Sequence, residues 1–130
     1  MSKYLFVYGT LMRKCPANEW SDFLNNNAVY LGEAITAGNL FKVADYPGLV
    51  KGAGLVYGEL YLLEDPTYVF HYLDSYEDYF PENPASSLYL REMAEVVTIE
   101  TGEKKMSWLY YYNQPTDHCF KYPDGKFIGK

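Results

Sequence analysis

Two short segments contain the residue types in this chain that could do chemistry. A glycine turn that follows a strand, as Gly9-Thr10-Leu11 does, can point successive backbone N–H groups into one concavity that binds carboxylates or oxyanions. The second segment ends in Glu77, which on a helix shares an apolar face with Phe70 and Leu73. Partial burial, a helix C-terminus and neighbouring carboxylates would raise the pKa of Glu77, so that it could exchange a proton with an amine near neutral pH.

Each of these features also has a simpler interpretation. Glu77 could simply be a solvated residue at the end of a helix, because glutamate is almost never fully buried without a partner. Gly9 could simply be the residue at which a strand ends. Residues 45–48 form a turn that could be the lip of a pocket or a plain turn. Arg91 could bind a substrate carboxylate or an internal acid, and we favour the internal acid.

The composition favours one folded domain over residues 1–130, with a C-terminal tail from about residue 113. The chain has 130 residues, of which 18% are aromatic, so a single core is expected and disorder is not. A net charge of −6 without a basic run argues against nucleic acid as a partner. No segment resembles a signal peptide or has transmembrane length, so we expect no membrane partner and a cytoplasmic location. The spacing of the cysteines and histidines matches no metal-binding or redox motif; these residues are Cys15, Cys119, His71 and His118.

The order of the predicted elements is irregular. Strands are expected at 3–8, 29–36, 39–43, 55–63, 90–99 and 106–112. Short helices are expected after Pro16 and after Asp65-Pro66, where an N-cap acid precedes a proline at the first helical position. Residues 48–54 and 78–87 are predicted to be loops. Because strands and helices do not alternate regularly, we predict an α+β domain with a curled, barrel-like sheet.

Short motifs along most of the chain, up to about Tyr112, resemble one family in type and order. They are Val7-Tyr8-Gly9-Thr10-Leu11, Leu31-Gly32-Glu33-Ala34, Asp45-Tyr46-Pro47-Gly48, Val56-Tyr57-Gly58-Glu59-Leu60-Tyr61, Leu73-Asp74-Ser75-Tyr76-Glu77, Tyr89-Leu90-Arg91 and Trp108-Leu109-Tyr110. The ordered set resembles the gamma-glutamyl cyclotransferase-like family, in its small bacterial-type branch.

The resemblance implies an α+β fold with a small mixed β-barrel-like sheet and flanking short helices. It also implies an enzyme without a metal or organic cofactor. In the implied reaction, the α-amine of a small γ-glutamyl substrate attacks its own γ-carbonyl, which gives 5-oxoproline and a free amine or amino acid. The resemblance places the catalytic glutamate on Glu77. It places substrate-binding residues on Tyr8, Gly9, Thr10, Leu11, Tyr46, Gly48 and Tyr110.

Two departures from the family pattern concern the pocket. Asp78 follows the glutamate where the family usually has glycine, and the C-terminal Gly-Asp-Trp element is absent, with residues 124–127 as a degenerate remnant. The leaving amine therefore stays open. The alternative functions are a non-catalytic binding module on the same fold and an interaction domain. A homodimer through an aromatic sheet face is one option for self-association.

Overall fold

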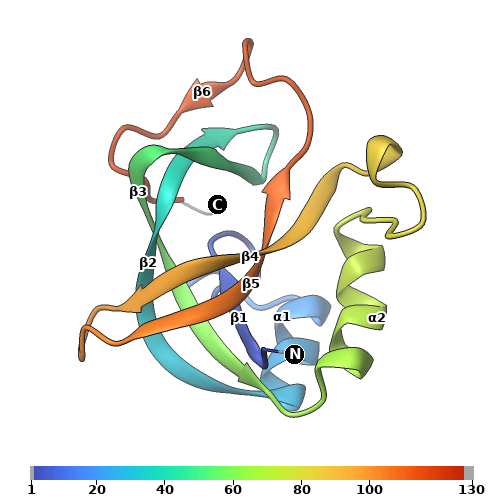
Figure 1. Cartoon of the computed structure of the whole chain (residues 1–130), viewed down its shortest axis with the longest axis vertical. Helices are drawn as coiled ribbons and strands as arrows, with labels where there is room; N and C mark the ends of the chain where they lie inside the picture. Colours follow the sequence, from blue (N-terminus) through green and yellow to red (C-terminus); the bar gives the residue numbers. More distant parts are fainter. Residues whose placement is uncertain (1, 128–130) are drawn as a thin grey trace.

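Five strands close into a barrel-like ring in a computed structural model that describes residues 2–127 (Figure 1). The ring runs β1-β3-β2-β4-β5 and returns to β1 through a parallel β1–β5 contact, whereas the other neighbours in the ring are antiparallel. The strands are β1 (Tyr4–Val7), β2 (Ala28–Lys42), β3 (Pro47–Leu63), β4 (Tyr89–Thr98) and β5 (Lys104–Tyr112). The predicted α+β fold with a mixed barrel-like sheet is confirmed.

Two helices flank the ring on the same side (Figure 1). α1 (Glu19–Asn27) begins at a capping box. The Asn18 side chain accepts hydrogen bonds from backbone N–H groups of the first helical turn, and the Ser21 side chain accepts one from the Asn18 backbone N–H. α2 (Pro66–Tyr76) begins where Asp65 and Pro66 predicted it. Its buried side chains are Val69, Phe70 and Leu73.

The long strands correct two sequence-based expectations. Residues 29–36 and 39–43 form one strand, β2, because Gly38 does not break it but takes a positive φ of 151° at an irregularity between Ala37 and Asn39. Residues 48–54 are not a loop but the first half of β3. Their glycines allow close packing, since a Cβ at Gly52 would collide with the Asn39 side chain. Packing therefore overrides the turn signal of glycine here.

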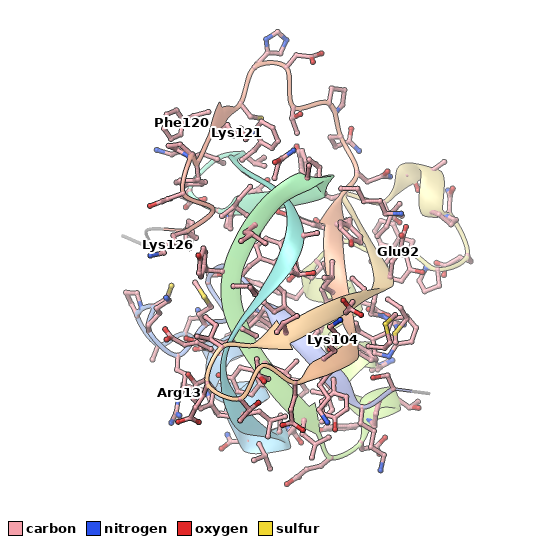
Figure 2. The ribbon with its side chains drawn as sticks, turned by 60° about the vertical axis from the view of Figure 1, so that its left-hand side comes forward. Arg13, Glu92, Lys104, Phe120, Lys121 and Lys126 are labelled. Carbon is pink, nitrogen blue, oxygen red and sulfur yellow. The ribbon has the colours of Figure 1, made fainter. Side chains whose placement is uncertain are left out.

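The connections around these strands contain two further short elements. The predicted loop 78–87 includes a 3-10 turn, η1 (Pro84–Ser86), and β6 (Phe120–Lys121) pairs with the end of β2. Figure 2 shows Phe120 and Lys121 at the same end of the molecule as the loop that leads into β6. In the described part of the chain, no helix combines the length and apolar character that a membrane span requires.

Candidate active site

The segment that follows β1 is anchored at its start by Tyr8. The buried Tyr8 hydroxyl donates to the Tyr110 carbonyl at 2.6 Å and accepts from the Leu49 backbone N–H at 3.3 Å. These bonds join β1 to β5 and β3 immediately before Gly9. The position of the predicted cradle is therefore fixed by the barrel wall.

Thr10, at the centre of this segment, is held from both helices. Its hydroxyl shares a hydrogen bond with the Tyr76 hydroxyl of α2 at 3.1 Å, and its carbonyl accepts from the Asn18 side chain at 3.1 Å. Asn18 is also the N-cap of α1, so one side chain begins the helix and holds the loop. A further turn bond runs from the Met12 N–H to the Gly9 carbonyl at 3.0 Å.

The backbone N–H groups of Gly9, Thr10 and Leu11 are the candidate anion site. Among residues 2–127, none of these three N–H groups donates a hydrogen bond to a protein acceptor. All three residues line a cavity of about 630 Å³. Unpaired N–H groups at the edge of a cavity can hold a carboxylate or an oxyanion from a ligand.

Glu77 lines the same cavity from the end of α2. It is the C-cap residue, and its backbone N–H donates to the Leu73 carbonyl at 2.9 Å. The helix therefore ends with this carboxylate at the cavity. Asp78 follows with a positive φ of 54°, which turns the chain away from the helix.

The electrostatic surroundings of Glu77 favour its protonated form. Burial raises its pKa to about 8, and the charges of Asp78 and then Asp74 act in the same direction. A carboxyl group that titrates near neutral pH can both accept and donate a proton, as a general acid–base group must. The charges of the neighbouring carboxylates, which the sequence predicts as one cause of a raised pKa of Glu77, therefore contribute to it.

Three tyrosine hydroxyls near Glu77 have structural partners. The Tyr8 hydroxyl donates to the Tyr110 carbonyl at 2.6 Å, and the Tyr89 hydroxyl donates to the Pro47 carbonyl at 2.6 Å. The Tyr110 hydroxyl donates to the Asp74 carboxylate at 2.7 Å. Burial is the main cause that raises the pKa of all three, and the Glu77 charge adds to it. They stay neutral and shape the wall of the cavity around the carboxyl group of Glu77.

Arg91 binds an internal acid, as favoured from the sequence. Its guanidinium contacts both oxygens of Asp74, at 2.8 and 3.2 Å. The same group stacks over Phe70 at 4.0 Å and over Trp108 at 4.7 Å, measured to the ring centroids. A bidentate pair of this kind fixes the second half of α2 against β4 and β5.

The mouth of the cavity is acidic and aromatic. Glu19 and Asp78 line it, and both side chains are exposed. Trp20 of α1 stacks on Tyr76 of α2 with ring centroids 4.9 Å apart, and both also line the cavity. Asp45 of the β2–β3 turn adds a third exposed carboxylate.

The structure places most of the predicted site residues around one cavity. They are Glu77, Tyr8, Gly9, Thr10, Leu11, Tyr46 and Tyr110. Gly48 lies apart from this lining, buried where a Cβ would collide with Tyr112 and Val43. In the described chain, no group of three or more His, Cys, Asp or Glu side chains is arranged to hold a metal ion.

Sequence reasoning missed several residues of the cavity. Asn18 and Trp20 fall in the segment after Pro16 that the sequence predicts only as a short helix, and Tyr89 belongs to a motif to which the sequence gives no role in the pocket. The capping signal at Asn18 was readable, but its bond to Thr10 joins segments that only the fold brings together.

Comparison with known proteins identifies the family. A family model described as gamma-glutamyl cyclotransferase, AIG2-like, matches residues 5–128. The chain belongs to this family. It is 32% identical over 114 residues to the gamma-glutamylcyclotransferase family protein YtfP of Escherichia coli (strain K12), which covers 87% of this chain and 85% of that protein.

Solved structures related to this cyclotransferase-family chain have the same fold. YkqA from Bacillus subtilis matches with a TM-score of 0.70 and 26% identity, over 98% of this chain but 40% of YkqA. An AIG2-like protein from Mus musculus matches with a TM-score of 0.68 and 25% identity, over 87% of this chain and 79% of the mouse protein. The membership that the ordered motifs predicted is confirmed.

Within this cyclotransferase-family domain, the departure at residue 78 has a structural meaning. Asp78 has a left-handed backbone, which glycine adopts without steric cost and other residues rarely adopt. The position therefore suits the glycine that the family usually has. Aspartate is tolerated there better than most residues, and it adds a negative charge next to Glu77.

Proposed function

We propose that this protein is a γ-glutamyl cyclotransferase in which Glu77 is the general base and acid. The observation that carries the proposal is the position of Glu77, with a pKa raised to about 8, on the same cavity as the unpaired N–H groups of Gly9, Thr10 and Leu11. One group can move a proton, and the other can hold negative charge. Intramolecular amide cleavage needs both.

The proposed reaction consumes no water. The neutral α-amine of the substrate forms a bond to its γ-carbonyl carbon, and the Glu77 carboxylate takes the proton that the attacking nitrogen then releases. The carbonyl oxygen becomes an oxyanion that the N–H groups of the Gly9–Leu11 segment stabilise. The bond to the leaving nitrogen then breaks as Glu77 returns its proton to that nitrogen, which yields 5-oxoproline and a free amine. The walls of the cavity hold the substrate folded, which supplies the orientation that closure of a five-membered ring requires.

The mouth of the cavity supports a leaving amine that is neutral or positively charged. Its three exposed carboxylates, Glu19, Asp45 and Asp78, would repel a leaving group that ends in a carboxylate. The stacked rings of Trp20 and Tyr76 offer a face to which an ammonium or an alkyl chain can bind. No lysine or arginine occurs among the described residues that line the cavity.

The alternatives explain less of the site. A module that only binds an ammonium–carboxylate ligand gains nothing from a carboxyl group whose pKa is raised to about 8, since an ordinary carboxylate would bind the ammonium better. An interaction domain does not account for a cavity that holds Glu77 beside Gly9.

A panel of γ-glutamyl compounds tests the proposal. The purified protein is incubated with γ-glutamyl amides of a diamine, of an uncharged alkylamine and of an amino acid, and 5-oxoproline is measured by mass spectrometry. We expect kcat/KM to decrease in that order and the preference to shrink at high salt, because exposed charges are screened. Absence of 5-oxoproline with all three classes from folded protein would contradict the proposal.

A further inference from the structure

Glu59, in the middle of β3, is a buried carboxylate that the chemistry proposed above does not use. Its side chain is 2% exposed, and it is not among the residues that line the cavity. A glutamate is rarely buried to this extent unless it has strong partners. The sequence motif Val56–Tyr61 contains it, and neither the reaction nor the substrate contacts explain that motif.

The partners of Glu59 are backbone groups at the end of the loop that follows β1. One carboxylate oxygen accepts from the Arg13 backbone N–H at 2.6 Å. Burial raises the pKa of Glu59, and the nearby backbone N–H groups of Arg13 and then Lys14 oppose that rise. A hydrogen bond from a backbone N–H to a buried carboxylate is a strong local anchor.

The side chains around this anchor are directed away from the cavity. The Arg13 guanidinium lies over the Tyr30 ring, 4.3 Å from its centroid, and Figure 2 shows Arg13 at the periphery of the molecule. Tyr30 in turn packs against Tyr61. Arg13 therefore contributes its backbone N–H to the loop, while its side chain covers the outside of the barrel.

The residue before Glu59 holds the other end of the same loop. Gly58 faces β1 so closely that a Cβ there would collide with the Val7 carbonyl and with the Phe6 ring. Val7 pairs with Glu59 in the β1–β3 register. Gly58 and Glu59 thus fix the chain at Val7 and again at Arg13, and the five residues between these two points include the Gly9–Leu11 cradle.

We propose that Glu59 is a positioning residue, which holds the backbone of the Gly9–Leu11 segment in place at the cavity by accepting the backbone N–H of Arg13. The kinetic consequence of this inference rests on the proposed function, but the structural consequence does not. Without the carboxylate, the end of the loop is free to turn its N–H groups toward water, and the cradle moves with it.

Kinetics of two variants test the inference. Glu59→Ala removes the acceptor, whereas Glu59→Gln keeps a carbonyl that can accept from Arg13. We expect kcat/KM per folded molecule to fall roughly tenfold or more in Glu59→Ala and less than about threefold in Glu59→Gln. The reason is that a small displacement of the groups that bind the substrate lowers the rate strongly. Glu33→Ala is the matched control, since Glu33 is exposed and its carboxylate forms a surface ion pair with Lys14, at 3.7 Å, while its backbone pairing in β2 is kept.

A second readout separates positioning from a general loss of stability. In ¹⁵N spectra of Glu59→Ala, the amide signals of Gly9, Thr10 and Leu11 should shift and those of Arg13 and Lys14 should exchange faster, with β4 and β5 unchanged. Unmoved Gly9–Leu11 signals, or wild-type kinetics per folded molecule, would overturn the inference. If Glu59→Ala does not fold, Glu59→Asp replaces it, because it withdraws the carboxylate by one methylene, and the same two outcomes decide.

The failure of this inference is distinguishable from failure of the proposed function. If the wild-type protein turns over no γ-glutamyl compound, the proposed function fails, and the amide signals still decide whether Glu59 positions the loop. If the wild type is active and Glu59→Ala is equally active, the positioning role alone fails.

Discussion

Two glutamates, Glu77 and Glu59, lie in contrasting surroundings, Glu77 partly buried at the cavity and Glu59 fully buried in β3. Burial raises the pKa of both. At Glu59, backbone N–H groups and the charges of Lys14 and Arg13 oppose that rise. At Glu77, the neighbours are Asp78 and Asp74, whose charges add to it. The comparison teaches that burial alone does not assign a role to a carboxylate, because the groups that face it decide whether it anchors the chain or exchanges protons.

Replacement of glutamate by glutamine at positions 77 and 59 should have its most different effects on the turnover rate. We expect Glu77→Gln to lower kcat by about 10²–10⁴-fold, the usual contribution of a general acid–base group, with the fold intact. Glu59→Gln should stay within about threefold of the wild type, because its carbonyl still accepts a backbone N–H. Both are measured as 5-oxoproline formed per folded molecule. Glu92→Gln, at a partly exposed ion pair with Lys51, is the control. Full activity of Glu77→Gln would remove the proposed base.

Truncation to alanine should separate the two regions in stability. Glu59→Ala leaves the Arg13 backbone N–H without its acceptor and creates a void, so we expect a loss of about 2–4 kcal/mol in the free energy of unfolding. Glu77→Ala removes a carboxyl group that burial and two like charges disfavour, so its stability at pH 8 should equal or exceed that of the wild type. Urea denaturation at pH 8 measures both. A large loss in Glu77→Ala would show that Glu77 has a structural partner.

The raised pKa of Glu77 also predicts how stability depends on pH. Between the ordinary carboxyl value and about pH 8, the folded protein holds a proton on Glu77 that the unfolded chain does not. Stability conferred by this group therefore falls as pH rises through that interval, by at most about 1.4 kcal/mol per pH unit. We expect wild-type stability, relative to Glu77→Gln, to fall from pH 5 to pH 8 in urea titrations. Parallel curves for the two proteins would indicate an ordinary pKa.

Residue 78 offers the smallest and most local test. Asp78→Gly should raise the free energy of unfolding by about 0.5–1 kcal/mol, because glycine carries no penalty for the left-handed backbone. It should also move the ascending limb of the pH–kcat profile to lower pH, since a charge that raises the pKa of Glu77 is gone. Asp117→Gly, at an exposed residue without a positive φ, should give neither effect.

Local signals in the sequence predicted much of the fold and of the candidate site. Helical spacing put Glu77 beside Leu73, and a cap followed by proline began α2 where it was expected. Glycine was the main source of error in the strands, since Gly38 and Gly52 are sites of close packing inside β2 and β3 rather than breaks. A glycine in the sequence indicates that a Cβ is disfavoured at that position. It does not distinguish a turn from the close approach of a neighbouring strand as the cause.

The remainder of the site depends on contacts between segments far apart in the chain. The bond of Asn18 to Thr10 and the stack of Trp20 on Tyr76 exist only after α1 and α2 lie against the same edge of the barrel. The anchor of Arg13 on Glu59 likewise needs β3 beneath the loop. Residue type and spacing do not encode such pairings, which is why Glu59 was part of a motif without a role. The substrate-binding residues and the role of Glu77 stay predictions that the experiments above test.

The closing contact of the barrel has a consequence for the order in which the protein is built. β1, near the N-terminus, is held between β3 and the much later β5, where Leu5 pairs with Trp108. Contacts between such distant parts of a chain are slow to form and need both parts to be present. The loop that follows β1 leaves the ribosome about one hundred residues before its anchor at Tyr110, since the two bonded residues, Tyr8 and Tyr110, are 102 positions apart. We therefore expect a nascent chain that ends before β5 to expose apolar strand edges and to have no cavity, so that activity appears only after β5 has been synthesised.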